Sequence, residues 1–188
     1  MPYHAPPKIC AVRSLASTRL FAVEAVDLLY ANGVAVCFER LRGQGAGAVL
    51  VVPITAAGEV LLIREYACGT ERYELGLPKG RIETGEAVLE AANRELQEEA
   101  GFAARRLTLL RSLTSAPAYS GQITQIVLAE DLYPARLPGD EPEPIEVVPR
   151  RFDALESLVF DEELTEARSI AALFLVRAYC QQRGAGYE

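Results

Sequence analysis

The chain is poor in the side chains that form common nucleophile and base pairs. It has a single histidine, His4, so catalysis by a Ser-His or Cys-His pair is not expected. Its four cysteines form no Cys-x-x-Cys pair, which argues against a zinc ribbon and a disulfide framework: Cys10, Cys37, Cys68 and Cys180. Any general base must therefore be a carboxylate, a lysine or a tyrosine.

Long apolar runs and an excess of positive charge are also missing. No stretch reaches the roughly 18 apolar residues of a membrane span, and the first residues, MPYHAPPKICAVRS, lack the apolar core of a signal peptide. The net charge of −7 disfavours nucleic acid or an anionic membrane as a partner. With 188 residues that are 50% apolar, the chain can fold around a sizeable core. We therefore expect a cytoplasmic protein with a small-molecule partner.

The pattern of apolar and turn residues predicts a mixed α/β chain. After a non-periodic arm over residues 1–17, a β-hairpin is expected over 19–42, with its turn at Asn32-Gly33. Further strands are expected over 49–55, 59–66, 72–75, 107–114, 122–129 and 145–152, and Pro149 confines the last to an edge or a bulge. Helices are expected from Thr84 to Gly101 and over 164–183. Two helices around a mixed sheet predict an α/β/α sandwich, with a small antiparallel N-terminal sheet before it.

The segment Gly80 to Phe102, GRIETGEAVLEAANRELQEEAGF, concentrates carboxylates on a predicted helix that is capped by Thr84. Its apolar residues share one sector of about 120° on a helical wheel: Val88, Leu89, Ala92, Leu96 and Ala100. Glu99 falls inside that sector and Glu95 lies at its edge, whereas a solvated acidic face would lie opposite. Carboxylates crowded against apolar residues become protonated unless a cation neutralises them, so the pattern indicates a divalent metal site. Oxygen ligands favour magnesium, manganese or calcium over zinc, and no EF-hand pattern is present.

The same segment resembles the signature of a known family. Gly80, Glu86, Arg94-Glu95-Leu96, Glu98-Glu99 and Gly101-Phe102 match the Nudix box, G-x5-E-x7-R-E-U-x-E-E-x-G-U, at every defined position. The resemblance implies the Nudix α/β/α sandwich and hydrolysis of a nucleoside diphosphate linked to another group.

Other stretches look like the Nudix subgroup of ADP compounds hydrolases, which is similar to the ADP-ribose pyrophosphatases: 18–33, 64–80, 139–144 and 166–176. This resemblance implies Mg²⁺-dependent cleavage, with Mn²⁺ as a possible substitute, of ADP-ribose, NADH and adenylated dinucleoside phosphates, with release of AMP. Pro117 fits the ADP-ribose branch, but Lys79 replaces its usual alanine, so activity on ADP-ribose alone does not follow. Two alternatives stay open: cleavage of nucleoside triphosphates or longer dinucleoside polyphosphates, and a Nudix-fold regulator that binds nucleotide without cleaving it.

Matching the box position by position implies roles for individual residues. Glu95, Glu98, Glu99 and the backbone carbonyl of Lys79 would hold the metal, with Glu98 and Glu99 serving in catalysis. The other box residues would be structural, and one of them, Arg94, could hold a carboxylate in place: Gly80, Glu86, Arg94 and Gly101.

Related pyrophosphatases take a further metal ligand or base from the part of the chain that here forms the acid-rich stretch 131–144. Glu141 and Glu143 are the candidates, and which of them serves stays open, as does an ordinary acidic surface loop.

Candidate substrate-binding residues lie at strand ends. Arg40 and Arg64 could clamp a phosphate, although ordinary surface arginines are an equal alternative. Tyr66 and Tyr73 could stack an adenine, but as strand aromatics they are expected in the core. Glu74 lies in the matching stretch 64–80 and completes this set.

Related pyrophosphatases pair N-terminal strands across a dimer to complete the adenosine pocket. The resemblance therefore implies a homodimer, in which residues 1–45 form a dimerisation and substrate element and residues 46–188 form the Nudix domain.

Overall fold

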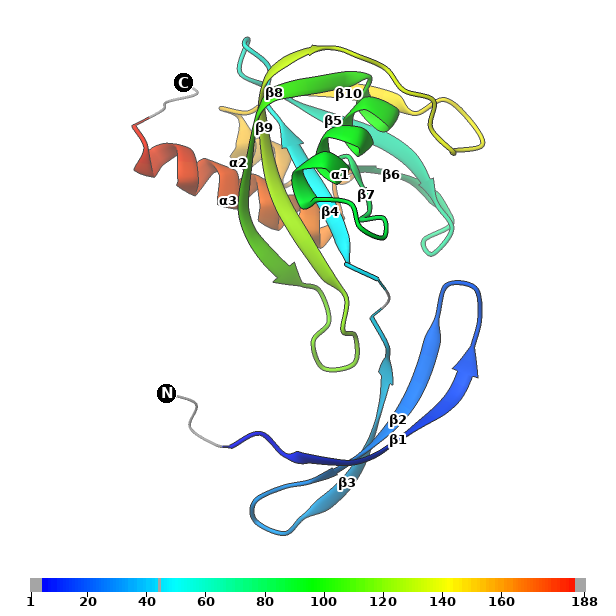
Figure 1. Ribbon diagram of the computed structural model, residues 1–188. Helices are drawn as coiled ribbons and strands as arrows, with labels where there is room; N and C mark the ends of the chain where they lie inside the picture. The colour runs from blue at the N-terminus through cyan, green and yellow to red at the C-terminus, as the bar shows by residue number, and fades with distance from the viewer. Residues whose placement is uncertain (1–4, 44, 185–188) are drawn as a thin grey trace. The chain divides into compact units, whose positions relative to one another are not determined.

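The computed structural model describes residues 5–43 and 45–184, so His4 lies outside the described part of the chain. The chain divides into two compact units, and each is described by itself (Figure 1). The first consists of Met1–Gln44 with Thr114–Ile123, and the second of Gly45–Leu113 with Thr124–Glu188. Within the described ranges, no helix is long and apolar enough to cross a membrane.

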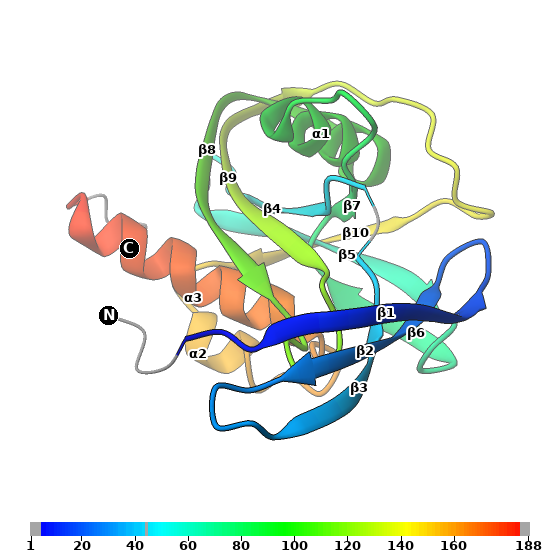
Figure 2. The same ribbon diagram turned by 60° about the horizontal axis from the view of Figure 1, so that its bottom comes forward.

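The first unit is built on a three-stranded antiparallel sheet, visible in blue in Figure 2. Its strands, β1 (Lys8–Ser17), β2 (Ala22–Leu29) and β3 (Ala35–Leu41), lie in the order β1-β2-β3. The predicted hairpin is confirmed as β2 and β3, and Gly33 in its turn has φ 83°, a left-handed conformation that favours glycine.

The predicted arm is wrong, because most of it is strand β1. Its pairing with β2 is shifted between Ile9 and Ala11 and again between Ser14 and Ala16. Each irregularity adds a residue and reverses the alternation of side chains, so the period of two that marks a strand does not show in the sequence.

One face of this sheet is apolar, and it is exposed on the two outer strands, whereas Val26 on the central strand is 4% exposed. Val12, Val26 and Phe38 lie side by side across the three strands, and the next row on this face is Ile9, Leu28 and Val36. The side chains of Ile9, Val12 and Phe38 are 54%, 46% and 48% exposed. A three-stranded sheet that leaves such a row open has little core of its own.

The second unit contains two sheets. One has the order β7-β4-β9-β8, with β4 parallel to β9, and the other has the order β10-β5-β6 with antiparallel pairs. The strands of the first are β4 (Ala48–Pro53), β7 (Lys79–Arg81), β8 (Phe102–Thr114) and β9 (Ile123–Pro134). Those of the second are β5 (Glu59–Ala67), β6 (Arg72–Gly76) and β10 (Glu146–Arg151). Pro149 lies in β10, an edge strand as predicted.

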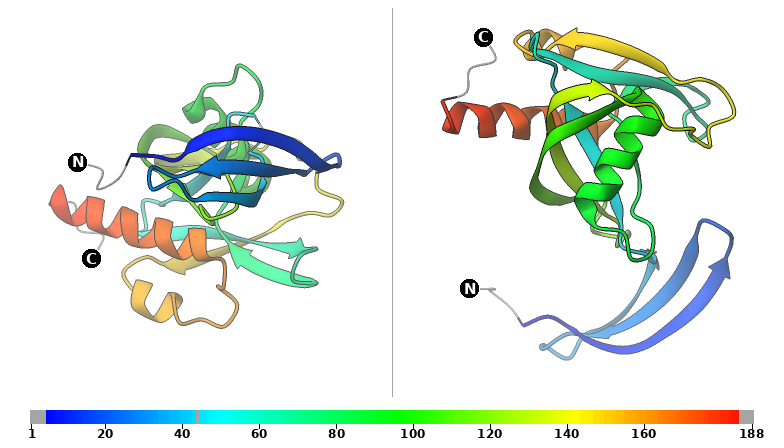
Figure 3. Two further views of the ribbon diagram at one scale, coloured as in Figure 1. Left: turned by 90° about the horizontal axis from the view of Figure 1, so that it is seen from below. Right: turned by 45° about the horizontal axis from the view of Figure 1, so that its top comes forward.

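Helices cover both sides of these strands. They are α1 (Val88–Glu95), which continues into the π-helical turn η1 (Leu96–Ala100), the short α2 (Leu155–Leu158), which was not predicted, and α3 (Ala167–Gln182). Leu50 of β4 lies in one core with Leu173 of α3, and its neighbour Val51 lies in another with Leu96 of η1. Figure 3 likewise shows α1 and α3 on opposite sides of the strands. The predicted α/β/α sandwich is confirmed.

The start of the acidic helix differs from the prediction. The N-cap is Ala87, not Thr84, because Glu86 N donates to Glu83 O at 3.1 Å and Gly85 takes φ 85°, so these residues form a turn. Leu89, predicted on the buried stripe, is 38% exposed. The predicted stop is confirmed, since Gly101 has a left-handed φ of 77°.

Candidate functional site

The helix α1 and the turn η1 carry two carboxylates into the interior of the second unit. Glu95 is 8% exposed and Glu99 is 3% exposed, and both lie among the buried residues of this segment, as the wheel predicted. Between them the helix widens, because Gly101 N donates to Leu96 O, five residues back instead of four.

Strand β7 lies directly against these carboxylates. A Cβ atom on Gly80 would lie 2.0 Å from Glu95 Oε1, so any larger residue there would displace the Glu95 carboxylate. One residue earlier, Lys79 N donates to Glu99 Oε2 at 2.8 Å. The glycine of the box therefore leaves room for the Glu95 carboxylate against the backbone of β7.

Arg94 connects the acidic residues of the box. Its Nε and Nη2 donate to the two carboxylate oxygens of Glu86 at 2.8 and 3.0 Å. Its Nη1 donates to Glu95 Oε1 at 2.8 Å and to Glu98 Oε2 at 2.9 Å, and its Nη2 also donates to Arg81 O at 2.9 Å. These bonds hold the pKa of the Arg94 guanidinium above its usual range, although burial opposes the shift, and they lower the pKa of Glu86. Glu86 and Arg94 thus make the contacts expected of structural residues.

Burial dominates the electrostatics of the two interior carboxylates. It raises the pKa of Glu99 to about 8, although the charge and backbone amide of Lys79 oppose the shift. Burial also raises the pKa of Glu95, where Arg94 opposes the shift and the charges of Glu98 and Glu141 add to it. A positive charge in addition to those of Arg94 and Lys79 would therefore be needed to keep both carboxylates ionised.

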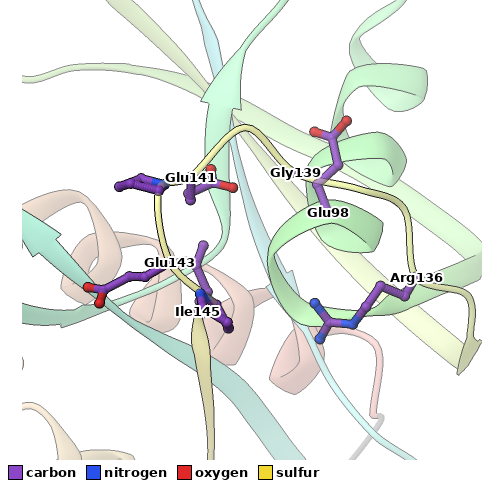
Figure 4. A pocket seen from close by; sticks show the side chains of 8 residues that line it. Glu98, Arg136, Gly139, Glu141, Glu143 and Ile145 are labelled. Carbon is purple, nitrogen blue, oxygen red and sulfur yellow. The ribbon is translucent and has the colours of Figure 1, made fainter.

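The acid loop, which we define as residues 135–145, separates the two loop glutamates. A hollow of about 270 Å³ lies beneath it, lined in part by Glu98, Arg136, Glu141 and Glu143. Glu141 folds back on the loop, where its Oε2 would lie 2.3 Å from a Cβ on Gly139. Glu143 instead accepts a hydrogen bond from Tyr73 Oη at 2.5 Å. Figure 4 shows the two side chains leaving the loop on different sides.

A second hollow, of about 400 Å³, lies between β5, β6 and the start of α3. Its lining includes Glu65, Tyr66, Glu74 and Lys79. Lys79 Nζ lies 3.2 Å from Glu65 Oε2, so a cation and several carboxylates line one wall of this hollow. Tyr66 and Glu74, two of the predicted substrate-binding residues, are thereby brought together.

The expectation that Tyr66 and Tyr73 lie in the core is wrong. They are 48% and 52% exposed and lie opposite each other where β5 meets the edge strand β6. Their rings meet edge to face with centroids 5.6 Å apart. The pair lies at an exposed edge of the sheet, so these strand aromatics are not buried.

The two predicted phosphate-binding arginines are already paired. Arg64 donates to Glu146 at 2.9 Å and to both carboxylate oxygens of Glu163 at 2.9 and 3.1 Å. Arg40, in the first unit, pairs with Glu24 at 2.9 Å. Either arginine would have to exchange a carboxylate for a phosphate, which the carboxylate pairing makes costly.

Ser169 is a residue that the sequence reasoning missed. It is fully buried, accepts a hydrogen bond from Leu77 N at 3.0 Å and donates to Glu166 Oε2 at 2.7 Å. Helix α3 thus supports the segment that leads to Lys79 and Gly80. Glutamate is not among the usual N-cap residues, so neither this cap nor the link from Ser169 to Leu77 is visible in sequence.

Comparisons with known proteins bear on this geometry. A model of the NUDIX domain matches residues 45–174, and one of the NudE-type Nudix hydrolase N-terminal domain matches residues 7–40. The chain belongs to the Nudix hydrolase family. This Nudix hydrolase is 49% identical over 178 residues to the ADP compounds hydrolase NudE of Escherichia coli (strain K12), covering 95% of each chain. It is 29% identical over 168 residues to the ADP-ribose pyrophosphatase of Bacillus subtilis (strain 168), covering 86% of this chain and 90% of the relative.

A crystal structure of an ADP compounds hydrolase is similar throughout. It is 47% identical, with a TM-score of 0.91 over 99% of this chain and 100% of the other. The Nudix fold and the Nudix resemblance expected from the sequence are confirmed, and the enzyme is a pyrophosphohydrolase by family.

Nudix hydrolases typically depend on a divalent cation. Within the described part of the chain, no three His, Cys, Asp or Glu side chains are yet arranged to hold one. Arg94 donates hydrogen bonds to Glu95 and Glu98, while Glu99 accepts one from the backbone amide of Lys79. The donor set nevertheless fits a hard cation, because it offers buried carboxylate oxygens with raised pKa values.

Proposed function

We propose that this Nudix hydrolase cleaves the diphosphate linkage of ADP-linked compounds in the presence of Mg²⁺ and releases AMP. ADP-ribose, NADH and adenylated dinucleoside phosphates are the proposed substrates. The single observation that carries the proposal is the buried pair Glu95 and Glu99 against the backbone of Lys79 and Gly80. The similarity to an ADP compounds hydrolase supports the choice of substrate class.

Glu95, Glu98 and Glu99, with the carbonyl of Lys79 beside them, are the proposed metal ligands. A cation bound there would shield the charge of the diphosphate and lower the pKa of an attacking water. Arg94 orients Glu95 and Glu98 through its hydrogen bonds, and Mn²⁺ could replace Mg²⁺ on the same oxygens.

We assign the loop carboxylate that orients the attacking water to Glu141 rather than Glu143. Glu141 makes no hydrogen bond to any described residue, and its charge acts on Glu95. Glu143 already accepts a hydrogen bond from the Tyr73 hydroxyl. A carboxylate with free lone pairs can accept a proton from water, whereas one that already accepts a strong hydrogen bond is a weaker base.

The hollow beside Tyr66, Glu74 and Lys79 is the proposed place for the nucleotide. Its volume of about 400 Å³ lies within the usual range for small-molecule pockets. The ammonium of Lys79 also favours one alternative, cleavage of longer dinucleoside polyphosphates, because a cation in the lining can bind an additional phosphate.

We also propose that the enzyme works as a homodimer. The exposed apolar row of Val12 and Phe38 on the first unit fits a second copy of this sheet, because an open three-stranded sheet needs cover. All four cysteines are free, which supports a reducing, cytoplasmic setting.

The substitution Glu99→Gln tests the proposal. With wild type, Mg²⁺ and a panel of ADP-linked compounds, nucleoside triphosphates and dinucleoside polyphosphates, we expect fastest turnover of the ADP-linked compounds with AMP as a product. Glu99→Gln should lower kcat by roughly a hundredfold or more, because a metal ligand loses its charge. Mg²⁺ should raise the unfolding temperature of wild type more than that of the variant.

The control is Glu162→Gln, which removes an exposed carboxylate that makes no hydrogen bond or ion pair with a described residue. It should match wild type in both measurements. Glu99→Gln with wild-type turnover would refute the assigned role. Tight ADP-ribose binding without turnover by wild type would favour the regulator, and preferred cleavage of triphosphates or longer polyphosphates would favour the other alternative.

A further inference from the structure

One hydrogen bond joins the acid loop to an edge of the sandwich. Tyr73 Oη donates to Glu143 Oε1 at 2.5 Å, across 70 positions of sequence. Tyr73 lies on the edge strand β6, and its side chain is 52% exposed. The bond also raises the pKa of the Tyr73 hydroxyl, as expected for a phenol that donates to a carboxylate. Because both partners lie at the surface, the bond is not required to satisfy buried polar groups.

The two ends of the acid loop are fixed by other contacts. At its start, Ala135 N donates to Gly101 O at 3.0 Å and Leu137 N donates to Gln97 O at 3.2 Å, which fastens the loop to η1. At its end, Ile145 packs against the core beneath α1. Among the described residues, Tyr73 alone makes a hydrogen bond to the intervening segment 138–144.

The loop couples the position of Glu143 to the position of Glu141. Pro142 and Pro144 flank Glu143, and each fixes a backbone φ angle, so the segment from Glu141 to Pro144 is stiff. Holding Glu143 on one side of the loop therefore directs Glu141 toward the other side, over the hollow that Glu98 lines.

We propose that Tyr73 and Glu143 are positioning residues, which hold the acid loop so that Glu141 faces the acidic helix. This inference rests on the proposed function, in which Glu141 orients the attacking water. Neither Tyr73 nor Glu143 touches the reacting atoms. Tyr73→Phe isolates the effect, because phenylalanine keeps the ring contact with Tyr66 and loses only the hydroxyl.

The test measures kcat, KM and unfolding temperature for four variants on an ADP-linked substrate in Mg²⁺. Tyr73→Phe should lower kcat roughly tenfold to a hundredfold, because a catalytic group is misplaced, with little change in KM or in unfolding temperature. Glu143→Ala should behave in the same way. Glu143→Gln should retain most of the activity, since its amide oxygen still accepts from the hydroxyl. Combining Tyr73→Phe with Glu143→Ala should cost no more than either alone.

Two controls keep the outcomes distinct. Tyr30→Phe, which removes a hydroxyl that bonds no described residue, should match wild type, and Glu141→Gln should lose more activity than any of the four. The inference is overturned if Tyr73→Phe keeps the wild-type kcat, if its activity falls only in step with its unfolding temperature, or if Glu143→Gln is as inactive as Glu143→Ala. A wild type that cleaves no ADP-linked compound would instead refute the proposed function, and this inference with it.

Discussion

At the scale of residues, Arg94 holds the site together. One guanidinium makes all five hydrogen bonds that connect Glu86, Glu95, Glu98 and the carbonyl of Arg81. A planar fork of donors can serve partners in several directions at once, which an ammonium cannot. The charge on Arg94 also offsets part of the repulsion among the carboxylates.

Arg94→Lys should therefore be a severe change despite the conserved charge. We expect the free energy of unfolding to fall by about 1–3 kcal/mol, because buried acceptors lose their donors. We expect kcat to fall at least roughly tenfold, because Glu95 and Glu98 lose their orientation. Urea denaturation and steady-state kinetics measure the two effects.

The matched control is Arg151→Lys, since Arg151 pairs only with Asp153 among the residues described, at an exposed site. It should change stability by a few tenths of a kcal/mol at most. If Arg94→Lys were as mild as this control, the connecting role of Arg94 would be wrong.

The sequence predicted the residues whose placement follows from local periodicity. Glu95 and Glu99 could be placed against the apolar stripe because burial repeats along a helix. Tyr73 could not be paired with Glu143, nor Ser169 with Leu77, because these contacts span 70 and 92 positions and depend on how separate elements pack.

At the scale of elements, the start of α3 depends on one side chain. The carboxylate of Glu166, the N-cap, accepts from Ser169 N at 2.7 Å and from Arg168 N at 3.3 Å. It also pairs with Arg168 Nε at 2.6 Å. Burial opposes ionisation of this carboxyl, but the ion pair and the hydrogen bonds outweigh it and lower its pKa.

Glu166→Gln should make the stability of the enzyme depend less on pH. Because the folded pKa of Glu166 lies below its ordinary value of 4.5, its ionised form stabilises the fold above pH 4.5, and this contribution is lost as the pH falls further. The variant should therefore be less stable at pH 7, by about 1 kcal/mol. This deficit should shrink as the pH falls below 4.5.

Denaturation of wild type and variant in parallel from pH 7 to pH 3 gives the difference in their free energies of unfolding. The contributions of other titrating groups cancel in this difference. Glu162→Gln, an exposed neighbour, serves as the control and should show no deficit at either pH. A deficit for Glu166→Gln that stayed constant over this range would contradict the assigned origin of its pKa shift.

Elements were predictable where the alternation of side chains was regular. Strands β4 and β5 and the hairpin of β2 and β3 match the prediction, because their apolar runs end at clear turn residues. Strand β1 was missed because two irregularities break its alternation. The start of α1 was misplaced because Thr84 resembles a cap but lies in a turn that Glu86 closes.

At the scale of the whole molecule, the first unit carries an exposed apolar surface that a partner could cover. Its sheet exposes Ile9, Val12 and Phe38 on one face, where a soluble monomer would be expected to carry polar side chains. The proposed homodimer covers this face with a second copy.

Phe38→Lys should shift the enzyme from dimer toward monomer, because it places a charge on the exposed part of the apolar face. Sedimentation velocity over a range of concentrations measures the shift. Ala35→Lys, on the same strand but the opposite face, adds the same charge and should leave the mass unchanged. A wild type that sediments as a fully active monomer at all concentrations would contradict the proposal.

The wide turn at Leu96–Ala100 has a consequence for anyone who wishes to transplant this motif. Its hydrogen bond from Gly101 to Leu96 accommodates one residue more than a regular helical turn. The same residues placed on an idealised helix would keep the order of the motif and would leave Glu95 and Glu99 on one side, but would not reproduce the wider turn that contains Glu99. A designed scaffold must therefore copy the irregular backbone as well as the carboxylates.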